Sequence, residues 1–512
     1  MTTGTHQEFG QQASPSAFFH LRKVHGRWEA NGTPACLLAQ HTHATSQREG
    51  AFAEWSWDGQ RLVVGNDRYG FYPLFYFSRP DEFCISGSIP TLLKRGAPTQ
   101  LDATALAVIL RLGYFVGEDT PFKAIRLVPP GARMQWENGS FSVAGEIPVR
   151  CLQELSREAA LDAFIELMRQ AIARRAAQHE DFVATISGGR DSRHILLGLC
   201  DSGKPPKFAV SVENYQPWPS PDTEVAAKVC QELGMRLVIL QQDSSMFQAE
   251  LRKNLKTSFS TLEHAWLLKL SSFLKGQTHA VYEGVAGDIL TGESPLGPTV
   301  EWQKLVAAGK FEEFADGLLD KDERMRAQLL QPEWNRECGR EIAIQRVAEE
   351  VQKHADAAIP TSSFFLFNRT RRVTSLSPMS LLREVGTVFT PYLDHDVYNL
   401  LASLPVTVLL DHKFHSDAMR KAYPRMAHIP FAQKQLQARQ CYRFFLRLAL
   451  ELGRFSLRST RTRLLRRSFL LPRLARCVVD PSYSVNLGWL GDMSTYLIHL
   501  ECAVAGEVLE LD

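Results

Sequence analysis

The chain has 512 residues, of which 45% are hydrophobic and 22% are charged, close to the average for folded globular proteins. This length exceeds one typical domain, and the composition excludes a disordered, fibrous or collagen-like chain. The 58 Lys and Arg residues nearly balance the 56 Asp and Glu residues, so the chain as a whole has no field that would attract nucleic acid or an anionic membrane. We therefore expect at least two domains, no nucleic-acid partner and no membrane partner.

The cysteines and the amino terminus bear on the cellular compartment. Nine cysteines are scattered along the chain without a C-x-x-C pair or a metal-ligand spacing, which is typical of reduced residues in the cytoplasm. Residues 1–12 are polar and lack the layout of a signal peptide, and no stretch reaches the roughly 18 apolar residues of a membrane helix. The sequence predicts a soluble, cytoplasmic protein.

The first 150 residues have the pattern of a β-rich domain. Between 17 and 83, short apolar or alternating runs are broken by turn residues, which predicts antiparallel strands with a hairpin turn at Asn31-Gly32. A helix is expected over about 103–111, and a short β pair near 134–143 closes the segment. We expect the first domain to span 1–150.

From residue 151 the pattern changes to alternating helices and strands, which is typical of the parallel sheet of a nucleotide-binding fold. The predicted helices are 156–178, 193–200 and 223–233, and the predicted strands are 182–186, 208–212 and 236–240. The remainder, from about 245, is expected to be mostly helical. We expect the second domain to span 151–512.

The segment Ser187-Gly188-Gly189-Arg190-Asp191-Ser192 joins a predicted strand to a predicted helix. Glycines let the backbone approach a phosphate group, and a helix amino terminus and serine hydroxyls donate hydrogen bonds to it. Asp191 offers a hard oxygen ligand for a magnesium ion carried by a nucleotide. The segment is neither a Walker loop nor a G-x-G-x-x-G fingerprint, and the alternative is an ordinary turn rich in small residues. We interpret it as a phosphate-binding loop.

Residues 187–192 resemble the pyrophosphate loop of the asparagine synthetase type, whose members cleave ATP to AMP and pyrophosphate to activate a carboxylate. Three further segments resemble motifs of that family in the same order. They are 66–76, similar to R-D-R-x-G-x-x-P-L-Y-Y, then 284–288, similar to the second acidic motif, and 391–394, similar to P-F-L-D. Residues 112–131 also fit. The resemblance spans about residues 60 to 435.

The resemblance implies an α/β protein. An amino-terminal Ntn-hydrolase-like β-rich sandwich is followed by an ATP-pyrophosphatase (adenine nucleotide α-hydrolase-like) parallel-sheet domain with a helical carboxy-terminal part. It implies ATP and Mg²⁺ as cofactors, with magnesium held by Asp191 and Asp288, the phosphates cradled by Ser187, Gly188, Gly189, Asp191 and Ser192, and the nucleoside lying against Gly284. The alternative for Asp288 is a helix cap.

The first domain of that family is a glutaminase whose nucleophile is a cysteine exposed by removal of the initiator Met. This chain begins Met1-Thr2-Thr3, and although threonine can serve as a terminal nucleophile, residues 3–14 are polar rather than the start of a buried strand. We also find no counterpart of the N-G-E-like glutamine-holding loop or of the arginine that binds the substrate carboxylate. We expect a degenerate glutaminase-like domain.

The chain departs from the family at the residue that would act as base. Asparagine synthetases have glutamate, and β-lactam synthetases tyrosine, at the position of Val285, and valine can do the work of neither. The candidate replacements are Glu263 and His264, together with Glu283, Glu293 and Glu384. For each of them the alternative is a solvated carboxylate or a hydrogen-bonded histidine.

The family also uses a lysine late in the synthetase domain to neutralise charge on the acyl-adenylate and pyrophosphate. Lys434 is at about the expected place, with Lys413 and Lys421 as competitors. We expect Lys434 to be the catalytic lysine, whereas the alternative for it is a solvated side chain.

Residues 439–476 contain eleven arginines and one acidic residue, Glu451, interleaved with apolar residues. Three interpretations remain: an amphipathic helical pair with a solvated arginine face, a docking surface for an acidic peptide or protein partner, and a nucleic-acid or membrane-surface patch. This cluster is the best indication in the sequence of a partner, and it is a weak one.

The sequence as a whole predicts an ATP-dependent, AMP-forming amide-bond ligase without its own glutaminase activity. Its substrate would be a small molecule or peptide that bears a carboxylate and an amine, as in the β-lactam synthetases and lasso peptide cyclases that it resembles. The alternatives are an ammonia-dependent enzyme acting on another acceptor and a catalytically silent ATP-binding scaffold.

Overall fold

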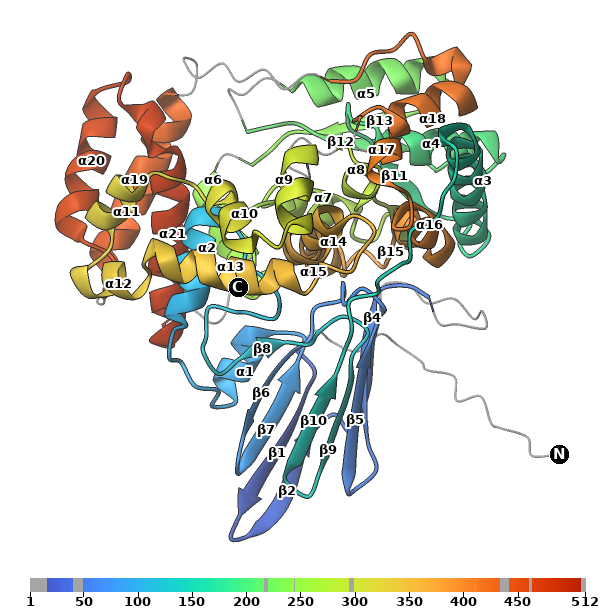
Figure 1. Cartoon of the computed structure of the whole chain (residues 1–512). Coiled ribbons are helices and arrows are strands. Elements are labelled where there is room, and N and C mark those ends of the chain that lie inside the picture. Colours follow the sequence, from blue (N-terminus) through green and yellow to red (C-terminus); the bar gives the residue numbers. More distant parts are fainter. Residues whose placement is uncertain are drawn as a thin grey trace.

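The first part of the chain folds as a β-sandwich, drawn in the lower half of Figure 1. The structure is a computed structural model that describes residues 16–39, 49–215, 220–243, 245–293, 299–409, 411–432, 442–459 and 463–507. One antiparallel sheet has the order β2-β1-β7-β6-β8 and the other β10-β9-β5-β4-β3. The strands are β1 Phe18–Val24, β2 Arg27–Gly32, β3 Ala35–Ala39, β4 Phe52–Trp57, β5 Arg61–Asn66, β6 Phe75–Arg79, β7 Glu82–Ser86, β8 Arg126–Leu127, β9 Arg133–Glu137 and β10 Ser140–Ala144.

Alternating side chains hold the two sheets together. In β5, Leu62 and Val64 are buried whereas Val63 is exposed, as the two-residue period of a half-buried strand requires. The rings of Phe19 in one sheet and Trp57 in the other lie 5.5 Å apart. The β-rich sandwich expected from the sequence is confirmed.

The hairpin turn between β1 and β2 is not where the sequence predicted it. The turn is His25-Gly26, whose φ angles of 50° and 81° are the positive values that a two-residue hairpin turn needs. Asn31 and Gly32 instead continue the ladder opposite β1. The prediction of a turn at Asn31-Gly32 was wrong because Gly26 already reverses the chain, so the paired strand runs on through residue 32.

A third sheet, outside the sandwich, consists of five parallel strands in the order β13-β12-β11-β14-β15. The chain order therefore reverses between β11 and β14, which makes their carboxyl ends the switch point where such sheets bind ligands. The three strands predicted beyond residue 180 are confirmed, whereas β14 and β15, of three residues each, were not recognised. The strands are β11 Val183–Thr185, β12 Ala209–Val212, β13 Leu237–Leu240, β14 Ala280–Tyr282 and β15 Thr387–Phe389.

Helices cover the parallel sheet, as the upper half of Figure 1 shows. The predicted helices correspond to α2 (Ala103–Leu112), α3 (Arg157–Ala176), α4 (Asp191–Asp201) and α5 (Pro221–Glu232). The other α-helices are α1 Ile89–Lys94, α6 Met246–Lys256, α7 Leu267–Leu274, α8 Gly287–Leu290, α9 Val300–Ala307, α10 Phe311–Leu318, α11 Glu323–Leu329, α12 Pro332–Glu337, α13 Arg340–Gln352, α14 Pro360–Phe365, α15 Leu376–Leu381, α16 His395–Leu401, α17 Val406–Leu409, α18 Phe414–Ala422, α19 Tyr442–Arg458, α20 Arg467–Val479 and α21 Leu487–Val504.

The arginine-rich segment forms a helical pair, α19 packed against α20. On α19, Leu448 and Leu452 are buried, whereas Arg447 and Arg454 are exposed. The described residues thus form an amphipathic pair with exposed arginines on α19, and the role of these arginines stays a prediction. Within the described part of the chain, no helix is long and apolar enough to cross a membrane.

The motif at residues 66–76 is a buried corner of the sandwich. The carboxylate of Asp67 is fully buried and accepts hydrogen bonds from four backbone amides, those of Phe52, Tyr69, Phe71 and Tyr72, at 3.0–3.2 Å. The side chain of Arg68, the next residue, donates a 2.7 Å hydrogen bond to Asn399 on α16, outside the sandwich. This motif therefore has a structural role, and it joins the two domains.

A π-helical segment, η1 (Leu366–Ser375), contacts the sandwich from the other side. Arg371 donates hydrogen bonds to the carbonyls of Gly70 (3.1 Å) and Val128 (2.7 Å). Arg372, which is fully buried, donates to the carbonyls of Gly117 and Asp119, both at 2.5 Å. Burial lowers the pKa of Arg372 to about 9, yet these acceptors keep its cation hydrogen-bonded. The two domains are thus fixed together by buried guanidinium groups.

Candidate functional site

Two loops meet at the switch point of the parallel sheet. After β11 the chain turns through residues 187–190 into α4, and after β14 it turns through residues 283–286 into the short helix α8. The backbone amide of Asp288 donates a 2.9 Å hydrogen bond to Oδ2 of Asp191. The structure thus brings together the two aspartate residues that the sequence singled out, through the backbone of one and the carboxylate of the other.

Glycine is required where the second loop passes Asp191. A Cβ atom at Gly284 would lie 2.9 Å from Cβ of Asp191, and one at Gly287 would lie 2.5 Å from its Cγ. Between them, Ala286 has a φ of 72°, a left-handed conformation that costs free energy in a residue with a Cβ. The loop is therefore shaped closely around the Asp191 side chain, and Gly284 contacts the 187–192 loop, whereas its predicted contact with a nucleoside stays a prediction.

The amides of the 187–192 loop point at oxygen atoms. The Ser187 amide donates to Oγ of Ser192 (3.0 Å), and the Gly189 amide donates to Oγ of Ser187 (3.1 Å). The Gly188 amide donates a 2.9 Å hydrogen bond to a carboxylate oxygen of Asp222, in the first turn of α5. A carboxylate therefore lies where the loop presents a donor for an anion, which is consistent with the predicted phosphate-binding role.

Buried aromatic and imidazole groups support Asp191 from behind. The Tyr392 hydroxyl donates to the Asp191 carbonyl at 3.2 Å, and Nδ1 of His415 lies 3.4 Å from Oδ1 of Asp191. His194, on α4, lies 3.1 Å from the far nitrogen of His415, and burial lowers the pKa of His194 well below its usual value. These three residues position the Asp191 carboxylate, and sequence reasoning did not identify them. Tyr392 belongs to the 391–394 motif, whereas no sequence signal pointed to His194 or His415.

The aspartate of the 391–394 motif has a different role. Asp394 is fully buried and accepts hydrogen bonds from Arg174 (2.6 Å) and Arg175 (2.8 Å) on α3. Although burial acts in the opposite direction, these two cations hold the pKa of Asp394 below its usual value. Asp394 therefore anchors α3 to α16.

Arg190 and Glu293 form a second polar cluster beside the loop. Oxygens of Glu293 accept hydrogen bonds from the Ser416 amide (2.8 Å) and hydroxyl (2.9 Å), and Glu293 also pairs with Arg190. The Arg190 guanidinium lies 4.6 Å from the centre of the Phe431 ring. The oxygens of Glu293 are thus already bonded to a cation and two donors, and its role as a base stays a prediction.

The predicted catalytic residues Glu263 and His264 lie in the loop before α7. Glu263 pairs with Arg369 of η1 at 3.4 Å, and burial lowers the pKa of His264 to about 4. Among the described residues, no hydrogen bond or ion pair joins either side chain to the two loops at the switch point. Their catalytic role stays a prediction.

The predicted catalytic lysine, Lys434, lies outside the described residues, as do Thr2 and Thr3. Its competitor Lys421 forms ion pairs with Glu158 and with Asp162 (2.6 Å) on α3. Glu384 is an exposed carboxylate paired with Lys256 and Lys275 at 2.7 and 3.2 Å. The solvated alternative therefore holds for Lys421 and Glu384.

Magnesium is the ion that the two carboxylates at the switch point would suit. The described residues contain no cluster of three or more His, Cys, Asp or Glu side chains that could hold a metal by itself. Mg²⁺ in nucleotide sites is held by one or two carboxylates together with the phosphates of the substrate. Asp191 and Asp288 fit this mode, and they would hold an ion only when phosphate oxygens complete its shell.

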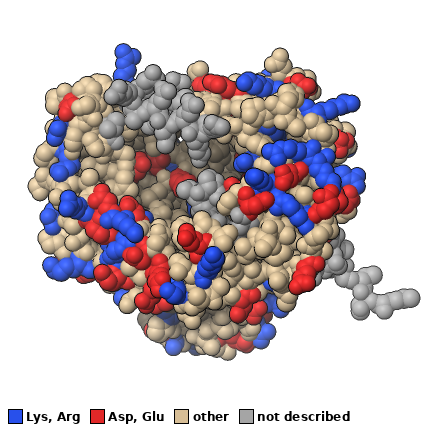
Figure 2. All heavy atoms as spheres, turned by 45° about the horizontal axis from the view of Figure 1, so that its top comes forward, with Lys and Arg blue, Asp and Glu red and all other residues tan. Residues whose placement is uncertain are grey.

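Two cavities lie near these loops. A groove of about 390 Å³ borders the carboxyl ends of β12 and β13, with Tyr215 and Phe247 on its apolar wall and Arg443 and Arg447 of α19 at its rim. Figure 2 shows this side of the molecule, which is hollowed near its centre with acidic side chains visible inside the hollow. The groove is large enough for a small ligand.

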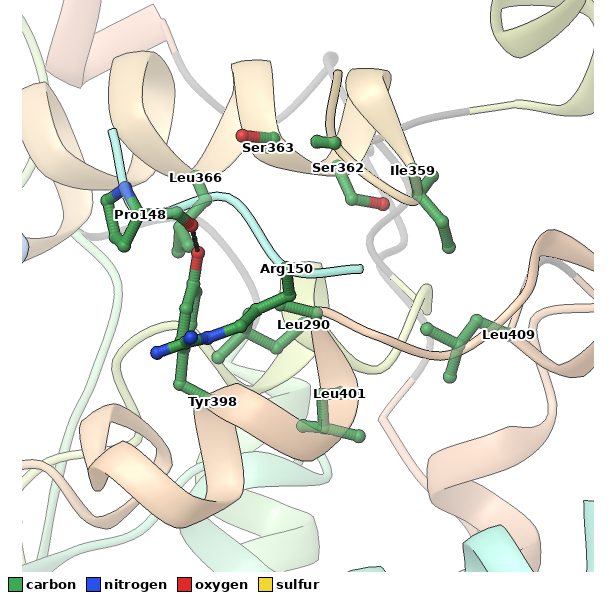
Figure 3. A pocket seen from close by; sticks show the side chains of 12 residues that line it. Pro148, Arg150, Leu290, Ile359, Ser362, Ser363, Leu366, Tyr398, Leu401 and Leu409 are labelled. Carbon is green, nitrogen blue, oxygen red and sulfur yellow. Dashed lines mark hydrogen bonds between the residues drawn. The ribbon is translucent and has the colours of Figure 1, made fainter. Parts of the chain in front are cut away.

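The other cavity, of about 30 Å³, separates the interdomain connection from α8 (Figure 3). Leu290 of α8 and Leu401 of α16 line it, and the Tyr398 hydroxyl donates a 2.5 Å hydrogen bond to the Pro148 carbonyl. A space of this size holds about one water molecule. It is a packing gap rather than a substrate site.

Comparisons with known proteins match part of the chain. Two solved structures are similar over part of the chain: one described as the allosteric regulatory enzyme of purine biosynthesis, and glutamine phosphoribosylpyrophosphate amidotransferase from B. subtilis in complex with ADP and GMP. Each is 13% identical with a TM-score of 0.15, and the matches cover 40% and 42% of this chain and 44% and 46% of those chains. This chain thus spans less than half the length of either protein.

A comparison with curated proteins finds no match. Residues 36–145 match the family model of the glutamine amidotransferase domain, so the sandwich is a domain of the glutamine amidotransferase type.

Proposed function

We propose that the chain is an ATP-dependent, AMP-forming amide-bond ligase of the asparagine-synthetase-like group. The observation that carries this proposal is the meeting of residues 187–192 and 284–288 at the switch point, where the Asp288 amide binds Asp191. In this proposal the 187–192 loop binds the phosphates, and Asp191 and Asp288 hold Mg²⁺, which neutralises charge on the leaving pyrophosphate when it is bound. The carboxylate of the substrate is activated by adenylation, and an amine then displaces AMP.

The proposal includes a sandwich domain that does not hydrolyse glutamine. The described cysteines of the sandwich, Cys36 and Cys84, lie in buried strands, and burial raises the pKa of each thiol to about 12. A thiol with so high a pKa does not supply a thiolate nucleophile at neutral pH. The nitrogen that is incorporated would therefore come from an amine on a small molecule or peptide, as in specialised-metabolite or macrolactam biosynthesis.

A second candidate function is transfer of ammonia to another acceptor. It is favoured by the match of residues 36–145 to a glutamine amidotransferase domain, because such domains supply nitrogen from glutamine. Product formation with ammonium salts alone, or with glutamine, would distinguish it from ligation of an amine.

The arginine face of α19 is the proposed docking surface for an acidic peptide or protein partner. Arg443 and Arg447 are exposed at the rim of the groove, next to the rings of Phe444 and Tyr215. Replacing both arginines with glutamine should weaken the binding of a fluorescein-labelled, glutamate-rich peptide, and 0.5 M salt should have the same effect. Arg169→Gln, at an exposed pair with Glu166 on α3, is the control that should bind the peptide normally.

The decisive experiment measures ATP binding and turnover by the full chain with Mg²⁺, following AMP and pyrophosphate separately from ADP. Pools of amino acids and short peptides serve as carboxylates and amines. We expect Mg²⁺-dependent ATP binding that is lost in Asp191→Ala and Asp288→Ala, and AMP release with at least one pool. A chain that binds ATP but releases no AMP with any pool would instead be the silent scaffold, and a chain that does not bind ATP would contradict the proposal.

A further inference from the structure

Glu283 is the one carboxylate candidate at the switch point itself. It directly follows β14, and its amide donates a 2.9 Å hydrogen bond to the Phe389 carbonyl of β15, so its backbone is fixed at the carboxyl edge of the sheet. The next residue, Gly284, packs so closely on Asp191 and on the Ser192 amide that no Cβ would fit. Glu283 is therefore one residue away from the contact between the two loops.

The Glu283 side chain is buried without full hydrogen bonding. The residue is 9% exposed, and its Oε1 has no hydrogen-bond partner within the described structure. Leaving a buried polar atom unpaired costs about 1–3 kcal/mol, so such atoms in a folded protein call for an explanation. A functional role at the ligand-binding edge of the sheet is such an explanation.

The environment of Glu283 also differs from that of the other carboxylate candidates. Glu263, Glu293 and Glu384 each form an ion pair with Arg or Lys. For Glu283, burial raises the pKa to about 7, against the hydrogen bonds from Thr185 and the Gly284 amide, and no cation contributes. A group with this pKa accepts a proton and releases it again near neutral pH.

We propose that Glu283 accepts the proton of the attacking amine, the task that Val285 cannot perform. This inference rests on the ligase function proposed above. The amine nitrogen forms the bond to the acyl carbon, the bond from that carbon to the AMP oxygen breaks, and AMP leaves with the electron pair. The proton of the resulting ammonium moves to a carboxylate oxygen of Glu283 and then to solvent.

The first test needs no substrate. Full-length wild type and Glu283→Gln are labelled with ¹³C at the glutamate carboxyl carbons and titrated by NMR. We expect one signal that is absent from Glu283→Gln, titrates near pH 7 and shifts when AMP and Mg²⁺ are added. A Glu283 signal with an ordinary glutamate pKa, or one that AMP does not shift, would overturn the proposal.

The second test separates adenylation from amide formation. With the pools described above, Glu283→Gln should keep ATP–pyrophosphate exchange within about twofold and lose amide formation by about 100-fold or more. Hydroxylamine, which is unprotonated at neutral pH, should restore product formation, and Glu283→Asp should restore part of it. Glu384→Gln is the matched control and should behave as wild type.

The outcomes distinguish the two proposals. Equal loss of exchange and amide formation in Glu283→Gln, or no loss of either, contradicts the role of Glu283 while the ligase function stands. A wild type that neither binds ATP nor exchanges pyrophosphate contradicts the ligase function, and the role of Glu283 falls with it.

Discussion

Asp191 and Asp288, 97 residues apart in the sequence, are joined by a 2.9 Å hydrogen bond from the Asp288 amide to Oδ2 of Asp191. The bond joins the loop after β14 to the loop after β11, so the Asp288 backbone lies against the Asp191 carboxylate. Because an ordered amide donor and the Tyr392 and His415 side chains surround Asp191, its carboxylate is oriented before any ligand binds.

Asp191→Asn tests the charge without changing the shape of the site. The side-chain oxygen of the substituted asparagine can still accept the Asp288 amide, but the loss of negative charge should weaken Mg²⁺-dependent ATP binding by about tenfold or more. Calorimetric titration with ATP, with Mg²⁺ and with EDTA, measures the effect. Asp58→Asn, in an exposed turn of the sandwich, is the control. Unchanged binding in Asp191→Asn would remove Asp191 from the site.

Gly287→Ala tests the close fit of the second loop. The added methyl group would lie 2.5 Å from Cγ of Asp191, so the loop or the carboxylate must move, at a cost of about 1–3 kcal/mol. We expect ATP binding to fall by about tenfold or more. Gly488→Ala, in α21, has no atom within 4 Å of the added Cβ and should bind ATP normally, with stability unchanged or slightly raised. Equal ATP affinity in the two variants would contradict the packing of Gly287 on Asp191.

Asp67→Asn tests the structural role of the motif at residues 66–76. Two amides donate to each carboxylate oxygen of Asp67, so an NH₂ group in place of either oxygen faces two buried N–H donors. We expect the free energy of unfolding to fall by about 2–4 kcal/mol, measured by urea denaturation. In the control Asp58→Asn the loss of stability should be small. Both backbone amides there donate to one oxygen of Asp58, and asparagine keeps one side-chain oxygen to accept them. A similar loss in both variants would argue against the buried corner.

Glu501 should make stability depend on pH. Burial raises its pKa to about 7, although the amides of Leu464 and Arg463 act against this, so the folded state binds the proton more tightly than the unfolded state. The protonated Glu501 carboxyl therefore stabilises the folded state fully below about pH 4.5. This contribution to the free energy of unfolding, about 2 kcal/mol, is lost as the pH rises to about 7. Urea denaturation at pH 5 and pH 8 should therefore show a smaller loss of stability at pH 8 in Glu501→Gln than in wild type.

The control for this pH effect is Glu384, whose pKa is shifted in the opposite direction to that of Glu501. Hydrogen bonds and the charges of Lys256 and Lys275 lower the pKa of the Glu384 carboxyl, so its stabilising effect is present above the unfolded pKa and is lost in acid. Glu384→Gln should therefore not reduce the loss of stability between pH 5 and pH 8. The same pH dependence in Glu501→Gln and wild type would contradict the raised pKa of Glu501.

Local patterns in the sequence determined much of this protein. The alternating strands of the sandwich, the helix after Ser156 and the strand–loop–helix unit around residues 187–192 all follow from side-chain periodicity, caps and glycines within short segments. Such features depend on neighbouring residues alone. The sequence therefore sufficed to place the strand–loop–helix unit at residues 187–192.

Only the tertiary structure decided which residues surround Asp191. His415 lies 224 residues after it in the sequence, and Asp222 reaches Gly188 only because α5 packs beside the 187–192 loop. Likewise, four similar acidic candidates could be told apart only by their surroundings, since cations pair with Glu263, Glu293 and Glu384 whereas burial governs Glu283. The reason is physical: proton affinity and orientation depend on desolvation and on charges that chain folding brings near, and these are not encoded in spacing along the sequence.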